Sequence, residues 1–359
     1  MSPTPTEAFT PTSAPMGIFP SDAVTIQKLN AYLDKLDALG NVTASILVAR
    51  GNTILLSKGY GLADEDLHLP NTPQTRFRIG SNTKQFTAMA ILLLQDRGKL
   101  HVQDLLCHYI TACPAAWQAI TLEELLTHTS GIPNFTDFSD FPSVIGTPVS
   151  VIDLIARFKS RPLEFTPGSQ WSYSNSGYIL LGYIIEQLSG ESYADFLQHN
   201  IFDPLHMHNT GYDSNSPALP AHATGYLSPH DKPVFLDMSE FYAAGALYST
   251  VGDMLVWDQA LMHGKLVSQA ALADMFRVHI PCPTGGCALS TDLGYGYGWF
   301  LADEYGYRYN YHWGRIDGFR SSNGFYPQAQ VSVIVLSNLE TTDTWGISSD
   351  LGAIALGVM

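Results

Sequence analysis

The sequence predicts an α/β (α+β) protein: one antiparallel sheet flanked by helices, with an all-helical domain inserted into it. Two observations predict this fold. Strand-like apolar runs occur near both ends of the chain, whereas helical periodicities and long loops dominate residues 81–285. An early hairpin that pairs with late strands closes one sheet and leaves the middle as an insertion. We therefore expect a sheet subdomain at 21–80 and 288–359, a helical subdomain at 81–287 and a binding cleft between them.

The first expected elements are a helix and a β-hairpin. Apolar residues recur at helical spacing from Ile26 to Leu36; Ser21 before them can cap the helix and Gly40 can end it. Two β-rich runs follow in SILVARGNTILLSKGYG, and the Gly51-Asn52 pair between them is typical of a two-residue hairpin turn. The start of the chain is therefore expected to contribute a helix and two neighbouring strands.

The last expected elements are again strands, followed by a helix. The stretch GYGWFLADEYGYRYNYHWG contains two strands around a turn at Asp303–Gly306, and QVSVIVLSN is a further strand. A final helical stretch begins at Thr344. These strands are the partners that the early hairpin needs to form one antiparallel sheet.

Composition excludes several classes of protein. The chain has 359 residues, 45% of them hydrophobic, and a net charge of −15 with only 18 Lys and Arg. Such a charge repels phosphate backbones and anionic lipids, so nucleic acid is not expected as a partner. No apolar run approaches the ~18 residues that indicate a membrane-spanning helix. The expected partner is a small-molecule or peptide substrate, and the oligomeric state is left open.

Residues 1–20 are expected to form a disordered tail. The stretch MSPTPTEAFTPTSAPMG has neither the basic start nor the apolar core of a signal peptide. The chain is therefore expected to be either cytoplasmic or a form from which an export signal has been removed.

The four cysteines form two local pairs, Cys107 with Cys113 and Cys282 with Cys287. Free buried thiols are the first interpretation. Two disulfides are the second, since PCPTGGC favours a tight loop that a disulfide could close. The spacings fit a structural zinc site poorly. No metal or other cofactor is expected, and the histidines of PLHMHN, His206 and His208, are interpreted as surface residues beside a turn.

A serine and a lysine stand one turn apart at the start of a helix that is apolar on every side. Ser81 and Lys84 precede the run Ala88–Leu94, and a helix of this kind is buried. A buried ammonium without water or a partner is costly, so the first turn must open onto a cavity. There Lys84 would have a depressed pKa and could accept the Ser81 proton, while the Ser81 N–H could stabilise an oxyanion. The alternative is an N-capping Ser81 beside a solvated Lys84.

Two later stretches carry polar residues that could join this pair. In WSYSNSGYILLGYIIEQLSG, Tyr173 and Asn175 precede a buried helix; the alternative is that Ser174 or Asn175 only caps it. In YHWGRIDGF, His312 and Gly314 lie at a strand edge, where a histidine can donate a hydrogen bond and a glycine lets a substrate approach closely. A lone histidine at such an edge is more often structural than functional.

The order SxxK, YxN and HxG makes the sequence resemble the serine β-lactamase and penicillin-binding-protein superfamily. It is most similar to the branch that holds class C β-lactamases, D-alanyl-D-alanine carboxypeptidases, D-amino-acid peptidases and carboxylesterases. The stretches FRIGSNTKQFTA, LEELLTHTSGIP, AAGALYSTVGDM and LGYGYGW also match this branch. The resemblance implies a β-lactamase/transpeptidase-like fold in a catalytic domain at 21–359, and a periplasmic or secreted location.

The resemblance also implies a role for each matching residue. Ser81 would be the acylated nucleophile, Lys84 its proton acceptor, and Tyr173 the group that passes a proton to the leaving group and helps to activate the deacylating water. The backbone N–H groups of Ser81 and Arg315 would form the oxyanion hole. The residues that would bind substrate are Asn175, which would bind its carbonyl, and His312, Gly314 and Arg315.

Two departures from the β-lactamase pattern lie in the third motif. His312 replaces the usual lysine, so a fixed positive charge for a β-lactam carboxylate is absent near neutral pH. With an unperturbed pKa of ~6.5, a histidine would bind a substrate carboxylate more weakly as the pH rises. Trp313 replaces a small threonine and either narrows the cleft or turns away from it. Both departures disfavour an efficient β-lactamase.

The sequence therefore predicts a serine hydrolase that forms an acyl-enzyme and cleaves peptide or amide bonds, in particular in D-amino-acid-containing peptides. A carboxylesterase of the same family is the alternative. A catalytically silent member that binds cell-wall peptide belongs to a different class, and the intact Ser81, Lys84 and Tyr173 disfavour it. An α/β-hydrolase or a zinc hydrolase is a poorer interpretation, because the chain contains neither GxSxG nor HExxH.

Overall fold

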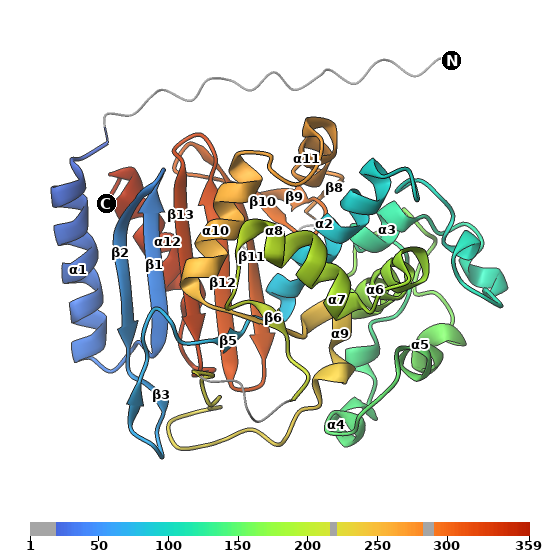
Figure 1. The fold of residues 1–359 in the computed structure, drawn as a ribbon, viewed down its shortest axis with the longest axis horizontal. Helices are drawn as coiled ribbons and strands as arrows, with labels where there is room; N and C mark the ends of the chain where they lie inside the picture. The colour runs from blue at the N-terminus through green and yellow to red at the C-terminus, as the bar shows by residue number, and fades with distance from the viewer. Residues whose placement is uncertain (1–18, 216–220, 283–290) are drawn as a thin grey trace.

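The structure is a computed structural model that describes residues 19–215, 221–282 and 291–359. Its central feature is an eight-stranded antiparallel sheet in the order β2-β1-β13-β12-β11-β10-β9-β8 (Figure 1). The early hairpin thus pairs with the last strand of the chain, as the sequence predicts. The strands are β1 (Ala44–Arg50), β2 (Thr53–Tyr60), β8 (Ile280–Pro281), β9 (Asp292–Tyr295), β10 (Phe300–Glu304), β11 (Tyr307–Ile316), β12 (Phe319–Tyr326) and β13 (Val331–Ser337).

Helices cover both faces of this sheet. On one face, α1 (Asp22–Ala38) packs on β2 and α12 (Thr344–Leu356) packs on β12 and β13. On the other face, α10 (Val251–Met262) packs on β1 and β13. Figure 1 shows α1 at one end of the molecule and the helical part at the opposite end.

The helical part surrounds α2 (Thr83–Asp96), which packs on α6 and α9. Two small sheets, β3-β4 and β5-β7-β6, lie outside the main sheet. The remaining helices are α3 (Leu122–Leu126), α4 (Phe141–Val144), α5 (Val151–Lys159), α6 (Asn175–Ser189), α7 (Tyr193–Leu197), α8 (Asp203–Leu205), α9 (Tyr242–Gly245) and α11 (Gln269–Met275). The remaining strands are β3 (Leu62–Asp64), β4 (Leu69–Pro70), β5 (Phe77–Arg78), β6 (Gly211–Tyr212) and β7 (Leu247–Ser249).

The sheet separates two hydrophobic cores. Alternate residues of a strand point to opposite faces, so a central strand between two helical layers is apolar along its whole length. In β1, Ile46 and Val48 face the core under α1 and α12, whereas Leu47 and Ala49 face the core shared with the helical part. This placement explains why SILVAR reads as a continuous apolar run.

The predicted elements are confirmed, with two corrections. The first helix, the hairpin around Gly51-Asn52, the turn before β11 and the helix from Thr344 are all present. The Ser21 side chain, however, makes no capping hydrogen bond. The expectation that 81–287 is all-helical is wrong, because β6, β7 and β8 lie within it and α10 belongs to the layer over the sheet. The tail predicted for 1–20 lies outside the described residues except for its last two.

The cysteines are oxidised where the structure describes them. Cys107 and Cys113 form a disulfide, and Cys282 is disulfide-bonded as well. The free-thiol interpretation is therefore wrong for these three residues, and the disulfide alternative holds. Cys287 lies outside the described residues. His206 and His208 are exposed, as predicted.

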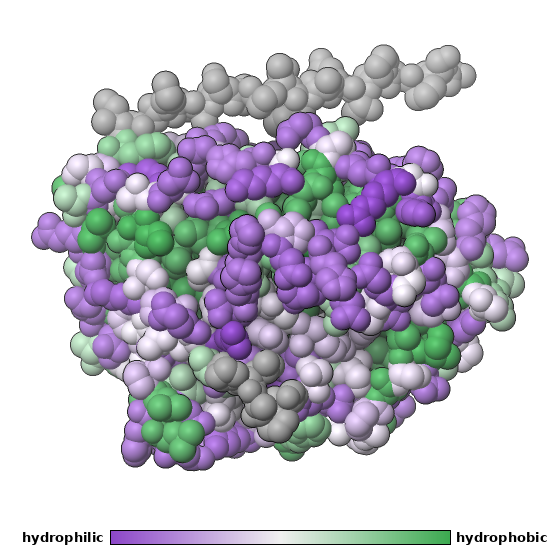
Figure 2. Space-filling view, viewed as in Figure 1, coloured by the Kyte–Doolittle hydropathy of each residue, from purple (hydrophilic) through white to green (hydrophobic). Residues whose placement is uncertain are grey.

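The described surface shows no continuous apolar face in the view of Figure 2, where apolar side chains form separate patches between polar ones. Within the described ranges, no helix combines the length and the hydrophobicity that a bilayer crossing demands.

A buried acid lies between α10 and the sheet. Asp258 is fully buried, and its Oδ1 accepts a hydrogen bond of 2.9 Å from the neutral Asn323 amide of β12. Burial raises the pKa of Asp258 to about 7. The folded state therefore binds a proton that the unfolded chain releases near pH 4, so this carboxyl destabilises the fold increasingly as the pH rises from about 4 to about 7.

We expect Asp258→Asn to stabilise the protein in a pH-dependent way. An amide cannot ionise, so the variant should gain about 2–3 kcal/mol more in free energy of unfolding at pH 8 than at pH 5, relative to wild type. Urea unfolding of both proteins at the two pH values measures the difference. A change in the free energy of unfolding that is the same at both pH values would contradict the raised pKa of Asp258.

Candidate active site

The predicted serine and lysine lie where the helical part meets the sheet. Ser81 belongs to a single 3₁₀ turn, Gly80–Asn82, that leads directly into α2, and Lys84 lies in the first turn of α2. Every residue of α2 from Thr83 to Leu94 is buried, as its apolar sequence predicts. The residue at the N-cap of α2 is Asn82, whose side chain makes no capping hydrogen bond, so Ser81 is not an ordinary N-cap.

The Lys84 amine is completely buried, and oxygen atoms from three segments surround it. Its Nζ atom has three hydrogen-bond partners: Ser81 Oγ at 3.0 Å, Asn175 Oδ1 at 2.8 Å and the Ala244 carbonyl at 2.8 Å. The rings of Tyr173 and Tyr178 lie 4.8 Å and 5.4 Å from it. The Lys84 amine of α2 thus has one hydrogen-bond partner in α6 and one in α9.

These partners allow the amine to be a base. Burial holds the pKa of Lys84 well below its usual range. A neutral amine can donate to the Asn175 and Ala244 oxygens, which only accept, and its lone pair is then free for the Ser81 hydroxyl proton. The geometry therefore directs the lone pair of Lys84 at Ser81.

Tyr173 completes the group around the serine hydroxyl. Its phenol lies close enough to the Ser81 hydroxyl to interact with it, and burial raises the pKa of Tyr173 above the usual value. Tyr173 therefore keeps its proton while it lies beside the nucleophile.

Asn175 is held in one orientation. Its Oδ1 accepts from Lys84, its Nδ2 donates to Thr136 Oγ1 at 3.1 Å and its backbone N–H donates to Asn134 Oδ1 at 3.0 Å. Ser174 stands at the N-cap of α6, where neither it nor Asn175 provides a side-chain cap. The interpretation of this stretch as a simple helix cap is thus wrong.

Gly314 permits contact between two parts of the backbone. A Cβ atom at Gly314 would lie 2.0 Å from the Ile79 carbonyl oxygen, and one at Gly80 would lie 3.0 Å from the Arg315 backbone nitrogen. The two glycines let the Ser81 turn lie directly against β11. The expectation that Gly314 leaves room for a substrate is corrected, because the Ile79 backbone fills that space.

His312 is placed differently from the prediction. It is completely buried, with Nε2 3.1 Å from the Tyr295 hydroxyl and Nδ1 2.6 Å from the Trp313 carbonyl. Burial, with a smaller contribution from the nearby basic Lys84, lowers the pKa of His312 to about 3. The prediction that His312 binds a substrate carboxylate in a pH-dependent way is therefore wrong. Its imidazole stays neutral, and both ring nitrogens already have hydrogen-bond partners.

Similarity to known proteins shows the family of this chain. The sequence matches the family described as Beta-lactamase over residues 29–351. It is 33% identical over 323 residues to the putative penicillin-binding protein PbpX of Bacillus subtilis (strain 168), a match that covers 89% of this chain and 75% of PbpX. The chain belongs to the Beta-lactamase family. As in that family, it is a serine hydrolase.

Two solved structures resemble this member of the Beta-lactamase family. The octameric penicillin-binding protein homologue from Pyrococcus abyssi superimposes with a TM-score of 0.82 at 28% identity, covering 92% of this chain and 77% of that one. The D-amino acid amidase from Ochrobactrum anthropi SV3 superimposes with a TM-score of 0.78 at 25% identity, covering 92% of this chain and 98% of that one. The fold predicted from the sequence is confirmed by both.

A pocket of about 300 Å³ opens over Ser81 in this Beta-lactamase-family chain. One wall is apolar, and the rim beside Ser81 is polar, with Asn175, Arg315 and Asp317. Burial raises the pKa of Asp317 above its usual value. The apolar wall consists of Phe135, Phe141, Ile145, Phe241 and Ile316.

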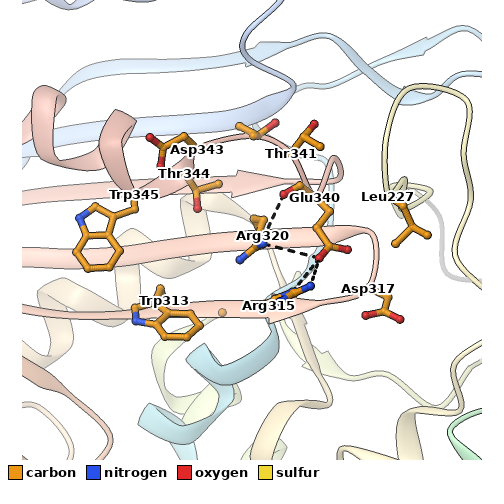
Figure 3. A pocket seen from close by; sticks show the side chains of 12 residues that line it. Leu227, Trp313, Arg315, Asp317, Arg320, Glu340, Thr341, Asp343, Thr344 and Trp345 are labelled. Carbon is orange, nitrogen blue, oxygen red and sulfur yellow. Dashed lines mark hydrogen bonds and ion pairs between the residues drawn. The ribbon is translucent and has the colours of Figure 1, made fainter. Parts of the chain in front are cut away.

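A second pocket, of about 890 Å³, begins where the first ends, since Arg315 and Asp317 line both. Figure 3 shows the two indoles of Trp313 and Trp345 on one side of it and Glu340 between Arg315 and Arg320 in its centre. Trp313 thus turns away from the serine pocket. This settles the alternative that the sequence left open.

Arg315 and Arg320 are tied in place in this second pocket. Arg315 Nη2 lies 2.6 Å from Glu340 Oε1, and Arg320 Nε donates to the Glu340 carbonyl at 3.1 Å. Fixed guanidinium groups beside two indoles provide both hydrogen-bond donors and apolar contact area.

Some residues of the site were missed in the sequence. Ala244 lies in AAGALYSTVGDM, a stretch that matches the family branch, but it contacts Lys84 through its backbone carbonyl, so its side chain does not indicate this role. Tyr295 and Tyr178 lie in stretches that match the family branch, LGYGYGW and SGYILLG, and these matches could have indicated them. Among the described residues, no group of three or more His, Cys, Asp and Glu side chains is arranged to bind a metal.

We expect Gly314→Ala to disrupt the active site through its backbone. The added methyl group would displace the Ile79 carbonyl and with it the Ser81 turn, lowering the free energy of unfolding by roughly 1–3 kcal/mol or more and reducing acylation of Ser81. Thermal unfolding and labelling with a fluorophosphonate measure the two effects.

Gly252→Ala is the matched control. Gly252 lies in α10, where a Cβ atom would meet no heavy atom closer than 3.9 Å, and alanine favours a helix over glycine. That variant should be unchanged or slightly stabilised. Equal behaviour of the two variants would show that the contact at Gly314 does not position the turn.

Proposed function

We propose that the protein hydrolyses amide bonds in D-amino-acid-containing peptides through an acyl-enzyme on Ser81. The observation that carries this proposal is the contact of Ser81 with two different proton-carrying groups. Lys84, with its lowered pKa, lies on one side, and Tyr173, which keeps its proton, lies on the other.

The first half of the reaction follows from these contacts. Lys84 accepts the Ser81 proton as Oγ attacks the substrate carbonyl carbon, and the carbonyl oxygen becomes an oxyanion. The backbone N–H groups of Ser81 and Arg315 are the proposed donors to that oxygen. The close packing of Gly80 on the Arg315 backbone supports this assignment, because it brings the two segments together.

Tyr173 favours amides as substrates. The amine of an amide leaves only after its nitrogen gains a proton, whereas the alcohol part of an activated ester leaves as a stable anion. Tyr173 holds a proton beside Ser81, next to the place where the leaving nitrogen departs. Water then attacks the carbonyl carbon of the acyl-enzyme. The Tyr173 phenolate takes a proton from the water, and Lys84 returns its proton to Ser81 Oγ as the acid product leaves.

The two pockets support a peptide rather than a small ester. The apolar wall over Ser81 accommodates the hydrophobic side chain of the residue that becomes the acyl group. The second pocket, with its indoles and arginines, accommodates the substrate beyond the scissile bond. The preference for a D-residue rests on the likeness to the D-amino acid amidase. The neutral His312 supplies no fixed charge for a β-lactam carboxylate, so we do not propose β-lactam hydrolysis.

We also propose that the enzyme works outside the cytoplasm. Disulfides persist in oxidising compartments and are rare in the cytosol. The Cys107–Cys113 bond and the oxidised Cys282 support this location.

The nucleophile and base are tested together. Ser81→Ala should abolish covalent labelling by a fluorophosphonate, and Lys84→Ala should slow acylation by roughly 10²–10⁴-fold, the usual share of a general base. Lys84→Arg is the matched control, because arginine keeps the positive charge but cannot lose its proton. It should be as slow as Lys84→Ala. A Lys84→Arg enzyme with near wild-type acylation would refute the role of the base.

The second pocket is tested by substrate length. Trp345→Ala should raise KM for a D-residue peptide that extends two or more residues past the scissile bond by roughly 5–20-fold, because it removes an apolar contact worth about 1–2 kcal/mol. The kcat/KM for the amide of the same acyl residue, which ends at the scissile bond, should stay within about twofold. Equal losses on both substrates would show that the indole supports the fold rather than the peptide.

A further inference from the structure

We propose that His128 is a positioning residue for Tyr173, which it holds beside Ser81 by accepting a hydrogen bond on its Nδ1 atom. This inference rests on the proposed function, in which Tyr173 protonates the leaving group. His128 lies in THTSG, a stretch whose role in the site is not otherwise explained. The side chain is buried and does not contact Ser81 or the serine pocket.

His128 is bonded to the residues on both sides of Tyr173. The Ser172 N–H donates to the His128 carbonyl at 3.0 Å, and the Ser174 N–H donates to His128 Nδ1 at 3.1 Å. Between these two bonds, the imidazole packs on the Tyr173 ring, with centroids 4.3 Å apart and planes 35° apart. One residue thus fixes the backbone before the phenol, the backbone after it and the phenol ring.

The hydrogen-bond partners define the tautomer of His128. Because Nδ1 accepts from Ser174, the proton of the neutral ring lies on Nε2, which is 3.3 Å from the Tyr295 hydroxyl. His312 donates from Nδ1 to the Trp313 carbonyl, so its Nε2 is free to accept from Tyr295. His128 Nε2 therefore donates to the Tyr295 hydroxyl, and this hydroxyl donates to His312 Nε2.

Protonation of His128 would break this arrangement, since Nδ1 would become a donor facing the Ser174 N–H. The surroundings prevent it. Burial is the main cause that holds the pKa of His128 well below its usual range, and the proximity of the basic groups Lys84 and His312, which disfavours a second positive charge, acts in the same direction. The other titratable groups that face the ring are Tyr173, Tyr178 and Tyr295.

The backbone of His128 guides the choice of variants. Its φ of +61° lies in the left-handed region, which favours glycine and asparagine. His206, on the surface, adopts the same region, so this conformation by itself assigns no function. Asparagine and glycine both accommodate the conformation, and only asparagine has an acceptor oxygen.

The experiment compares His128→Asn with His128→Gly on two substrates that share one D-acyl group: an unactivated amide, whose leaving group needs a proton, and a p-nitrophenyl ester, whose leaving group does not. The kcat/KM ratio of amide to ester is the readout, because loss of fold or of active enzyme changes both substrates equally. Tyr173→Phe serves as the reference and should lower this ratio by roughly 10²-fold.

We expect His128→Gly to lower the ratio by at least about tenfold, because the Ser174 N–H loses its acceptor. We expect His128→Asn to keep the ratio within about threefold of wild type, because Oδ1 can take the place of Nδ1. An amide-selective loss in His128→Asn overturns the proposal, even if His128→Gly does not fold. An unchanged ratio in His128→Gly also overturns it.

The reference variant separates this inference from the proposed function. If Tyr173→Phe lowers amide and ester hydrolysis equally, Tyr173 is not the proton donor and the proposed function fails in that part. If Tyr173→Phe is amide-selective while His128→Gly is not, the proposed function stands and only the role of His128 is wrong.

Discussion

The active site depends on the burial of one amine. Lys84 lies at the start of a helix that is enclosed on every side, and an uncompensated charge there would cost several kcal/mol. The fold compensates it with three oxygen atoms from α6, α9 and the turn that carries Ser81. Segments separated by more than 150 residues must therefore converge on a single nitrogen atom. Because two of these oxygens can only accept, the same arrangement that solvates the amine also directs its lone pair at Ser81.

A second constraint joins the two halves of the site. The Ser81 turn belongs to the helical part, and the third motif belongs to β11 of the sheet. Gly80 and Gly314 let the two backbones meet without a side chain between them. Ser321 strengthens the contact, since its hydroxyl donates to the Ile79 carbonyl at 2.7 Å and accepts from Asn82 at 2.7 Å. The position of the nucleophile relative to the sheet is therefore fixed by backbone packing.

The surroundings of Ser81, Lys84 and Tyr173 are polar and largely uncharged. His128, His312 and Tyr295 exchange hydrogen bonds in a buried layer behind Tyr173, and burial keeps all three neutral. A charged lysine in place of His312 would add a second cation near Lys84. The neutral third motif thus suits a site in which a lysine must give up its proton. In the function that we propose, recognition of an extended substrate then falls to Trp313, Trp345 and the arginines that line the second pocket.

The sequence by itself determined that the early hairpin pairs with late strands, that the helix behind Ser81 is buried and that Lys84, Tyr173 and Asn175 belong with Ser81, because apolar periodicity and motif spacing can be read along the chain. It did not determine what His312 and Gly314 contact, since a side chain on a strand can face a cleft or a core and the periodicity of the strand is the same in both cases. Only the tertiary structure placed His312 in the core with a pKa of about 3. It alone also brought the Ala244 carbonyl to Lys84, because a backbone oxygen has no identity in a sequence. The role that we assign to His128 has the same origin, because this histidine and two backbone N–H groups more than forty residues away become neighbours only when the chain folds.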